Sequence, residues 1–347
     1  MSRAASAAPS IALAGLAALA GLSGACRRSE PPHAANGSAT AAAPATTAAP
    51  AAPAAPAAPA APAASAVPGA PAAFAASCTE LPFAESTPVP EASGAAWLTI
   101  DGALSLVVIS DSGNDGAYVI VDPETGVVRE RGKLPLGDKG DDLEGVAARG
   151  DKLYVVTSPG WIRVYERKGQ GFALTEGPYP LGPIDIEDKG GGIGDKPPQG
   201  AGMVCGATHT NCGRNYEGLC LAPGRTSSRC VGFAASKADG HLYCIVEQGG
   251  KLVAVHPGAI PITRPGALSD CAFSEDNRLY VGTNLFDAGN VYRVTGWEDP
   301  PRAQVTRIGP LLIGFPETLA VRGDIIYRMS DSGRAPSFMK KYRCPGQ

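Results

Sequence analysis

Acidic residues recur through most of the 347-residue chain at intervals of about 50 positions, each before a short run of small apolar residues. The five acids are Glu91, Glu144, Glu217, Asp270 and Glu317. Carboxylates held at one depth repel one another and raise each other's pKa values, whereas a bound cation relieves the repulsion and Ca²⁺ prefers oxygen ligands. The pattern therefore predicts a calcium site. The alternative is that the acids accept hydrogen bonds from backbone amides of neighbouring repeats.

A second acidic motif, Ser-Asp-Ser-Gly, occurs at residues 110–113 and again at residues 330–333. Asp111 and Asp331 would add carboxylates to the same cation site, and Asn114, just after the first copy, would add an amide oxygen. The alternative is that both aspartates stabilise turns, because an Asp side chain readily bonds to the backbone two residues further on.

Each acid begins a repeat that is predicted to consist of β-strands. The apolar run is one strand, and an Asp-Gly, Gly-Asp or Asp-Asn pair is typical of the tight turn that follows. A return strand rich in β-formers comes next, such as Leu-Tyr-Val-Val at 153–156, and then a third strand, such as residues 161–165. The repeat that begins at Glu217 is predicted to carry an insertion before a return strand that holds Tyr243.

Three or four strands per repeat, arranged radially, are typical of a β-propeller. The sequence therefore predicts an all-β fold with five or six blades, the sixth within residues 178–216. The first strand of each blade lines the central channel, which would place the five acids around the axis. Residues 79–84 are predicted to form the outer strand of the last blade, and a Cys78–Cys344 disulfide would lock the ring.

Three short segments resemble the Asp-x-Glu-Gly-Ile/Val motif of the SdiA-regulated propellers and of the esterase-like phytase domains. They are Asp-Leu-Glu-Gly-Val-Ala at 142–147, Asn-Tyr-Glu-Gly-Leu at 215–219 and Pro-Glu-Thr-Leu-Ala at 316–320. The resemblance implies a calcium-binding propeller and, more loosely, an esterase or phosphatase. The chain more distantly resembles the calcium-dependent lactonases of the gluconolactonase and paraoxonase kind. That likeness implies an axial metal held by Glu144 or Glu217, with Asn114 or Asn284 as amide ligands.

The first 77 residues are predicted to direct export rather than to fold. A short basic start, an apolar run at 11–22 and small residues before Cys26 resemble the signal peptide of bacterial lipoproteins. This resemblance implies a signal peptide at 1–25, lipidation of Cys26 and a membrane anchor. Arg27, in place of an aspartate retention signal, implies the outer membrane, and the alternative is an ordinary signal peptide cut nearby. Residues 26–77, rich in Ala and Pro, are predicted to be a disordered linker that leads to the propeller domain at 78–347.

Cysteine usage agrees with export, because the even number of cysteines after Cys26 favours disulfide bonds. Two pairs can be predicted, Cys78 with Cys344 around the whole domain and Cys205 with Cys212 within one loop. The alternative for that loop is a zinc site made of both thiolates and His209. The net charge of −3 excludes a strongly basic nucleic-acid-binding protein, so no nucleic-acid partner is expected.

Signals for specific catalytic machinery are weak. None of the four histidines stands where it would be marked as a general base, and no Gly-x-Ser-x-Gly nucleophile motif occurs. The sequence therefore favours a membrane-tethered, extracytoplasmic propeller that binds a protein or small-molecule ligand, with Ca²⁺ as a structural component. The alternative is a calcium-dependent hydrolase of esters, lactones or phosphoesters that acts at the channel mouth.

Overall fold

The computed structural model describes residues 78–346 apart from 138–139, 185–203, 225–227, 263–266, 286–287, 312–313, 332 and 334–335. Strands form nearly all the regular structure of this part of the chain, and its one helical element is a 3-10 turn at Pro300–Arg302. No helix among these residues is long and apolar enough to cross a bilayer. The all-β prediction is confirmed. The predicted signal peptide, the linker and Cys26 lie outside the described residues.

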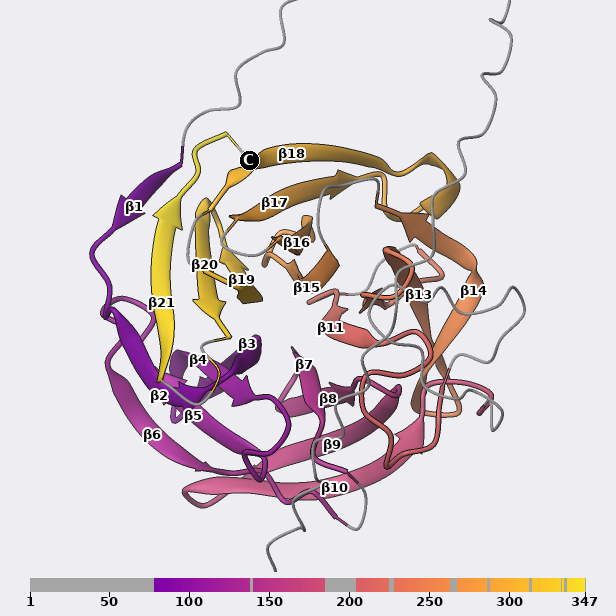
Figure 1. Cartoon of the computed structure of the whole chain (residues 1–347), viewed down its shortest axis with the longest axis horizontal. Coiled ribbons are helices and arrows are strands. Elements are labelled where there is room, and N and C mark those ends of the chain that lie inside the picture. The colour runs from indigo at the N-terminus through magenta and orange to yellow at the C-terminus, as the bar shows by residue number, and fades with distance from the viewer. Residues whose placement is uncertain are drawn as a thin grey trace, which may run out of the picture. The chain divides into compact units, whose positions relative to one another are not determined.

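Five antiparallel sheets stand around one axis in the described part of the chain, which confirms the propeller and gives it five blades (Figure 1). Blade 1 consists of β3 (Ala92–Ile100), β4 (Ala103–Ser110), β5 (Ala117–Val121) and β6 (Val128–Lys133). Blade 2 consists of β7 (Leu143–Arg149), β8 (Lys152–Thr157), β9 (Trp161–Lys168) and β10 (Gly171–Pro180). Blade 3 consists of β11 (Tyr216–Leu221), β12 (Gly232–Ser236), β13 (His241–Gln248) and β14 (Lys251–Pro261). Blade 4 consists of β15 (Ala267–Phe273), β16 (Leu279–Leu285), β17 (Ala288–Thr295) and β18 (Gln304–Pro310). Blade 5 consists of β19 (Pro316–Arg322), β20 (Ile325–Ser330), β21 (Pro336–Arg343) and β1 (Thr79–Leu81), with β2 (Ser86–Pro90) also paired to β21.

The turns between the first two strands adopt the backbone that their residues predict. Asp101 and Gly102 join β3 to β4 with φ of 50° and 77°, in the left-handed region that Asp and Gly tolerate. Asn277 has a φ of 62° in the corresponding turn of blade 4, and Gly323 has a φ of 57° in blade 5. These turns fix which face of each inner strand points to the neighbouring blade.

The strand assignment of blade 3 differs from the prediction. The strand that pairs with β11 is β12, through Leu219 opposite Ala234, and Tyr243 lies in the third strand, β13. What was expected to be an insertion is therefore a strand, Gly232–Ser236, together with the loop before it. The cause is local composition: Gly-Phe-Ala-Ala-Ser resembles the small-residue inner strands, whereas the Leu-Tyr pair imitates the return strands of the other blades.

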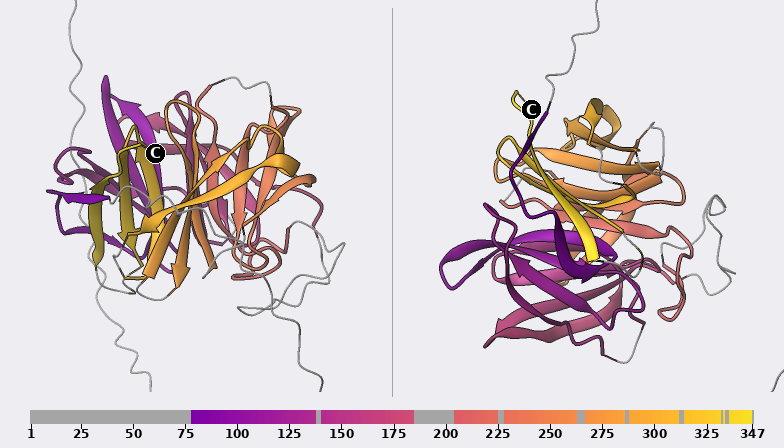
Figure 2. Two further views of the ribbon diagram at one scale, coloured as in Figure 1. Left: turned by 90° about the horizontal axis from the view of Figure 1, so that it is seen from above. Right: turned by 60° about the vertical axis from the view of Figure 1, so that its left-hand side comes forward.

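The ring closes through both ends of the domain. Thr79 pairs with Arg343 and Leu81 with Lys341, so β1 forms the outer edge of blade 5. Cys78 and Cys344, directly next to these strands, form a disulfide. The predicted closure by an N-terminal strand and the predicted Cys78–Cys344 bond are confirmed, although the strand ends at Leu81 rather than at residue 84. Figure 2 shows β1 beside the C-terminal strand in two further views.

Apolar side chains pack between adjacent blades rather than within one central core. Five clusters of buried residues fill the five spaces between neighbouring sheets; for example, Val146 and Leu153 of blade 2 pack with Ile109 of blade 1. Close to the axis the inner strands approach so tightly that a Cβ on Gly145 would stand 2.4 Å from the backbone nitrogen of Leu219. The glycine that follows Glu144 is therefore required by the approach of two backbones.

Candidate functional site

A β-bulge interrupts every inner strand at the same level. In blade 2, Leu143 pairs with Thr157 and Gly145 with Val156, so Glu144 is left outside the ladder. The corresponding residues of blades 1 to 5 are Ser93, Glu144, Glu217, Ser269 and Glu317. Bulges re-aim side chains and are frequent beside binding sites. This ring carries acids in three blades and serines in two.

The ring differs from the one predicted. Glu91 precedes β3 and therefore lies before the bulge of its blade, and Asp270 follows the bulged Ser269. A shift of one residue changes the direction of a side chain in a strand, so Asp270 points elsewhere than Glu217 does. Its carboxylate accepts hydrogen bonds from the backbone amides of Cys271 (2.7 Å) and Leu319 (2.8 Å). Asp270 thus joins blade 4 to blade 5, as the alternative reading of the acids expected.

A second polar ring stands at the same end of the channel. Each second strand places a hydroxyl residue opposite the start of the inner strand, as Ser110 lies opposite Ala92, and the next residue lies at the same end of the blade. In blades 1 to 5 those next residues are Asp111, Ser158, Lys237, Asn284 and Asp331. The predicted Asp111 and Asp331 are therefore equivalent positions of two neighbouring blades.

Three carboxylates gather between blades 1 and 2. Each of Asp111, Asp142 and Glu144 offers an oxygen atom that lies within 4.8 Å of the other two. Asp142 and Glu144 are buried, and no hydrogen-bond donor among the described residues contacts the carboxylate of Glu144. A carboxylate cluster of this size and geometry matches the hard oxygen ligands of Ca²⁺.

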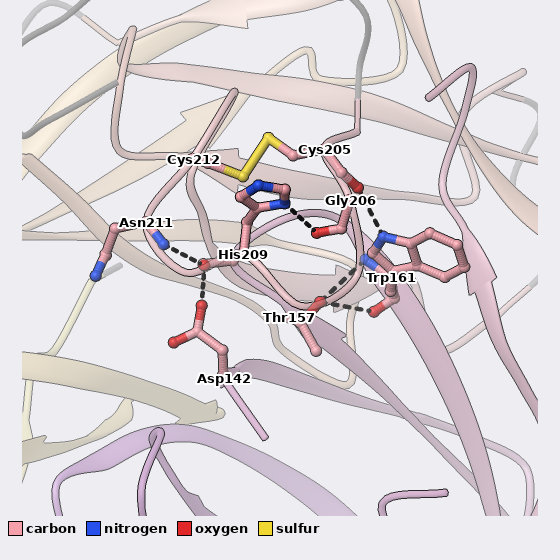
Figure 3. The surroundings of a disulfide bond; sticks show 9 residues. Asp142, Thr157, Trp161, Cys205, Gly206, His209, Asn211 and Cys212 are labelled. Atoms are coloured by element: carbon pink, nitrogen blue, oxygen red, sulfur yellow. Dashed lines mark hydrogen bonds between the residues drawn. A yellow bond between two sulfur atoms is a disulfide. The ribbon is translucent and has the colours of Figure 1, made fainter. Parts of the chain in front are cut away.

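The cluster is held by a loop from blade 2. Ser158 donates its hydroxyl hydrogen to the carboxylate of Asp142, and the backbone amide of Asn211 donates to the Ser158 hydroxyl at 2.9 Å. Figure 3 shows Asp142 beneath the loop that the Cys205–Cys212 disulfide closes. That disulfide confirms the predicted pair and excludes the alternative zinc site, because both sulfurs are bonded to each other. His209, on the same loop, contacts the carbonyl oxygen of Gly206 through Nδ1.

Blades 3 and 5 bring a second pair of acids to the mouth, with one lysine between them. The Nζ atom of Lys237 stands 2.8 Å from Oε2 of Glu217 and 3.9 Å from Oε1 of Glu317, which also accepts a hydrogen bond from Asn284. Glu217 is only 2% exposed, yet its Oε1 atom is buried with no hydrogen-bond partner among the described residues. The lone pairs of this oxygen atom are therefore not engaged by any hydrogen-bond donor of the described residues.

The acids at the mouth hold their protons more tightly than usual. Burial raises the pKa of Asp111 to about 7, and the charges of Asp142 and Glu317 add to this effect. Burial likewise raises the pKa of Glu144 well above its usual value, with further contributions from Glu217 and Asp111. The sequence predicted raised pKa values from like-charge repulsion alone, but burial is the larger cause.

Lys237 offsets part of this effect for its two partners. Burial raises the pKa of Glu217 to about 7 although Lys237 acts against it, and burial with the charge of Glu217 raises the pKa of Glu317 to about 8. Burial acts to lower the pKa of Lys237 itself, but the carboxylates of Glu217 and Glu317 outweigh it, so that pKa lies above its usual value. One cation therefore faces several acids.

The remaining predicted residues lie at the edge of this site. Asn114 donates through Nδ2 to Oε2 of Glu91 at 2.7 Å and also contacts two carbonyl oxygens of its own turn. Asp331 accepts the backbone amide of Gly333 at 2.7 Å, and Asp111 accepts that of Ser112. Asp331 therefore makes the turn contact, two residues on, that the alternative expected, whereas Asp111 bonds to the next residue and lies beside Asp142 and Glu144.

Two residues of the site were missed from the sequence. Asp142 stands two residues before Glu144 in the Asp-Leu-Glu segment, and this close pair of acids is the signal in the sequence that points to it. Lys237 gave no signal, because it follows β12, the strand that was not predicted. With β12 assigned, its position matches that of Asp111 in blade 1.

No protein-family model and no curated protein sequence matches the chain. Among solved structures, a luciferin-regenerating enzyme aligns with 76% of this chain and 95% of its own at 10% identity and a TM-score of 0.43. Glutaminyl cyclase of Myxococcus xanthus aligns with 77% of this chain and 96% of its own at 12% identity and a TM-score of 0.44. A catalytically inactive virginiamycin B lyase of Staphylococcus aureus, bound to quinupristin, aligns with 78% and 89% at 12% identity and a TM-score of 0.40. These likenesses transfer no functional residue to this chain.

Proposed function

We propose that this protein is an exported propeller that binds Ca²⁺ at its channel mouth and holds a ligand there. The observation that carries the proposal is the cluster of Asp111, Asp142 and Glu144, whose carboxylate oxygens lie within 4.8 Å of one another. Three carboxylates in a partly dehydrated site cannot all ionise at neutral pH without a counter-charge. Lys237 forms its ion pair with Glu217 and reaches Asp142 and Glu144 only through its charge, so one lysine does not balance the three carboxylates.

Ca²⁺ fits this cluster better than a softer metal does. The cluster offers carboxylate oxygens alone, and the sulfurs of Cys205 and Cys212, on the loop above it, are bonded to each other. Ca²⁺ takes six to eight oxygen ligands, so three side chains leave positions for water and for the oxygen atoms of a ligand. The ligand class that follows is a molecule or partner chain with carboxylate, phosphate or carbonyl oxygens.

Export is supported by the covalent structure of the domain. All eight cysteines from Cys78 to Cys344 form four disulfides, which are typical of an oxidising, extracytoplasmic environment. Attachment to the outer membrane through a lipid on Cys26 remains part of the proposal. Mass spectrometry of the mature N-terminus tests it: a diacylglyceryl modification on Cys26 supports the anchor, and an unmodified terminus beyond Cys26 removes it.

The cation is tested by thermal unfolding of the mature protein after removal of divalent ions. Millimolar Ca²⁺ is expected to raise the melting temperature, because a ligand that binds only the native state stabilises it by mass action. The effect should disappear in Asp142→Asn and Glu144→Gln. It should persist in Asp151→Asn, a change in an exposed hairpin turn. Equal responses to Ca²⁺ in all four proteins would show that Asp142 and Glu144 do not bind the cation.

A second candidate function, hydrolysis, is favoured by one observation. Oε1 of Glu217 is buried and has no hydrogen-bond partner within the described part of the chain, and the pKa of this carboxyl is about 7, the range in which a general base works best at neutral pH. Bound Ca²⁺ would supply charge that polarises the carbonyl or phosphoryl oxygen of an ester. Glu217 would take the proton of the attacking water as that oxygen bonds to the acyl carbon or phosphorus, and would return it to the leaving alkoxide.

A substrate screen separates the two candidates. Lactones, aryl esters and phosphoesters should be turned over in the presence of Ca²⁺ and not with a chelator if the hydrolase is correct, and Glu217→Gln should abolish turnover while Ca²⁺ still binds. Absence of turnover with intact Ca²⁺ binding leaves ligand binding as the function.

A further inference from the structure

A cavity of about 320 Å³ lies at the other end of the inner strands from the acids. All five inner strands contribute to its wall, through residues that follow the bulge towards the strand end. The cavity therefore lies on the propeller axis. Figure 1 shows β3, β7, β11, β15 and β19 arranged around this axis. Neither the predicted acids nor the cation cluster belongs to it.

Small side chains at one register position create this space. Three residues after each bulge the five blades carry Ala96, Ala147, Cys220, Ala272 and Ala320. Four of the five residues are alanines, whose side chains are short, so the strands leave room between them. Cys220 also forms a disulfide with Cys271 of the next blade, which fixes the distance between β11 and β15 at this level.

Two aromatic side chains, Trp97 and Phe273, form part of the wall, and each makes a contact with a neighbouring residue that fixes its orientation. Trp97 is half-buried, and its indole N–H donates to the carbonyl oxygen of Val321 at 2.8 Å. Phe273 packs edge-to-face against Trp297, with ring centroids 4.9 Å apart. Both rings thus keep a fixed orientation and present an apolar surface to the cavity.

Two charged side chains, Glu275 and Arg322, stand at the rim of the cavity and differ in their hydrogen bonds. Glu275 accepts the backbone amide of Gly323 at 3.0 Å. The guanidinium of Arg322 lies 6.0 Å from the Trp97 ring and has no carboxylate partner among the described residues. Both side chains are exposed and line the cavity. Arg322 is therefore the rim group with unused hydrogen-bond donors, and those donors match a carboxylate.

We propose that this cavity binds a small hydrophobic carboxylate, with its apolar body between Trp97 and Phe273 and its carboxylate on Arg322. The volume is about twice that of a 150 Å³ apolar cavity, a size that accepts one benzene ring. A bicyclic aromatic or a short branched aliphatic body therefore fits. An apolar cavity with few polar groups that fix orientation is typical of small-molecule sites.

The test uses 2-naphthoate as the probe and its neutral isostere, 2-naphthamide, in calorimetric titrations of the mature protein. Naphthoate is expected to bind at least tenfold more tightly than the amide. In Arg322→Gln this preference should vanish, because the rim cation is gone. In the matched rim variant Glu275→Gln it should remain. Failure of naphthoate to bind at millimolar concentration, or equal binding of both probes to the natural protein, would overturn the proposal.

Filling the cavity provides the second arm. Ala147→Leu should occupy the space and reduce naphthoate affinity at least tenfold, and Ala272→Val, a smaller change on another blade, should reduce it in part. Melting temperatures identify any variant that fails to fold. Glu144→Gln should bind naphthoate as the natural protein does, because the acids lie at the opposite strand ends. Undiminished affinity in folded Ala147→Leu would place the probe elsewhere and contradict the proposal.

Discussion

Replacement of Glu217 by Gln should stabilise the protein at alkaline pH and leave it unchanged in acid, provided that divalent ions are absent. The side chain is 2% exposed, and burial raises its pKa from 4.5 to about 7. Below about pH 4.5 the carboxyl is protonated in both the folded and the unfolded chain, so it adds no pH dependence there. Between pH 4.5 and pH 7 the unfolded chain loses this proton before the folded one does, so stability falls as pH rises.

The magnitude follows from the two pKa values. A difference of about 2.5 pKa units corresponds to about 3 kcal/mol, all of it lost once the pH exceeds 7. Gln has the shape of the protonated acid and no charge, so Glu217→Gln escapes this loss. Its excess stability should therefore be close to zero at pH 4.5 and on the order of 3 kcal/mol at pH 8.5. The loss of the ion pair with Lys237 reduces that gain, because Glu317, 3.9 Å from Lys237, is a more distant partner than Glu217.

The assay is urea unfolding, followed by tryptophan fluorescence at pH 4.5 and pH 8.5 in chelator, for the natural protein and Glu217→Gln. Glu247→Gln is the matched control, because Glu247 is a surface residue paired with Arg149, and such changes stay within about 0.5 kcal/mol. A variant that is less stable than the natural protein at pH 8.5, or equally displaced at both pH values, would refute the reasoning.

Three further outcomes are expected. Gly145→Ala should lower stability by about 1–3 kcal/mol, since its Cβ would meet the backbone of blade 3, whereas Gly309→Ala, with open space around its Cβ, should be close to neutral in the same thermal scan. Removal of the Cys78–Cys344 disulfide, which spans 266 residues, should cost up to about 5 kcal/mol in urea unfolding, and a loss below 1 kcal/mol would show that strand pairing alone closes the ring. Calcium affinity should rise from pH 6 to pH 8.5 as the carboxyls with raised pKa values release their protons, and calorimetry that finds a flat or falling affinity would contradict the proposed ligands.

The fold was predictable because each blade repeats the same local chemistry. Asp101 and Gly102 show how turn residues alone separate the two inner strands of a blade, and Cys78 and Cys344 mark where the ring closes. Blade 3 was misread because the segment Gly232–Ser236 has the composition of an inner strand. Strand identity there is decided by pairing across the sheet, which composition does not encode.

The sequence indicated that acids gather at the inner strands, but it did not indicate which residue of each strand occupies the bulge. A bulge displaces the sequence by one residue, and one residue reverses the direction of a side chain in a strand. For this reason Asp270 accepts a hydrogen bond from the backbone amide of Leu319 in the next blade. Ser269 occupies the position that corresponds to Glu144. Asp142 and Asp111 come together only because neighbouring blades meet, a contact between distant repeats that spacing along the chain does not reveal.

Calorimetric titration of Ca²⁺ into the chelator-treated mature protein tests the central claim most directly. We expect saturable binding to one site in the natural protein and in Asp151→Asn, and at least tenfold weaker binding in Glu144→Gln. Absence of any Ca²⁺ binding, or binding that Glu144→Gln leaves unchanged, would contradict the cation site at the channel mouth.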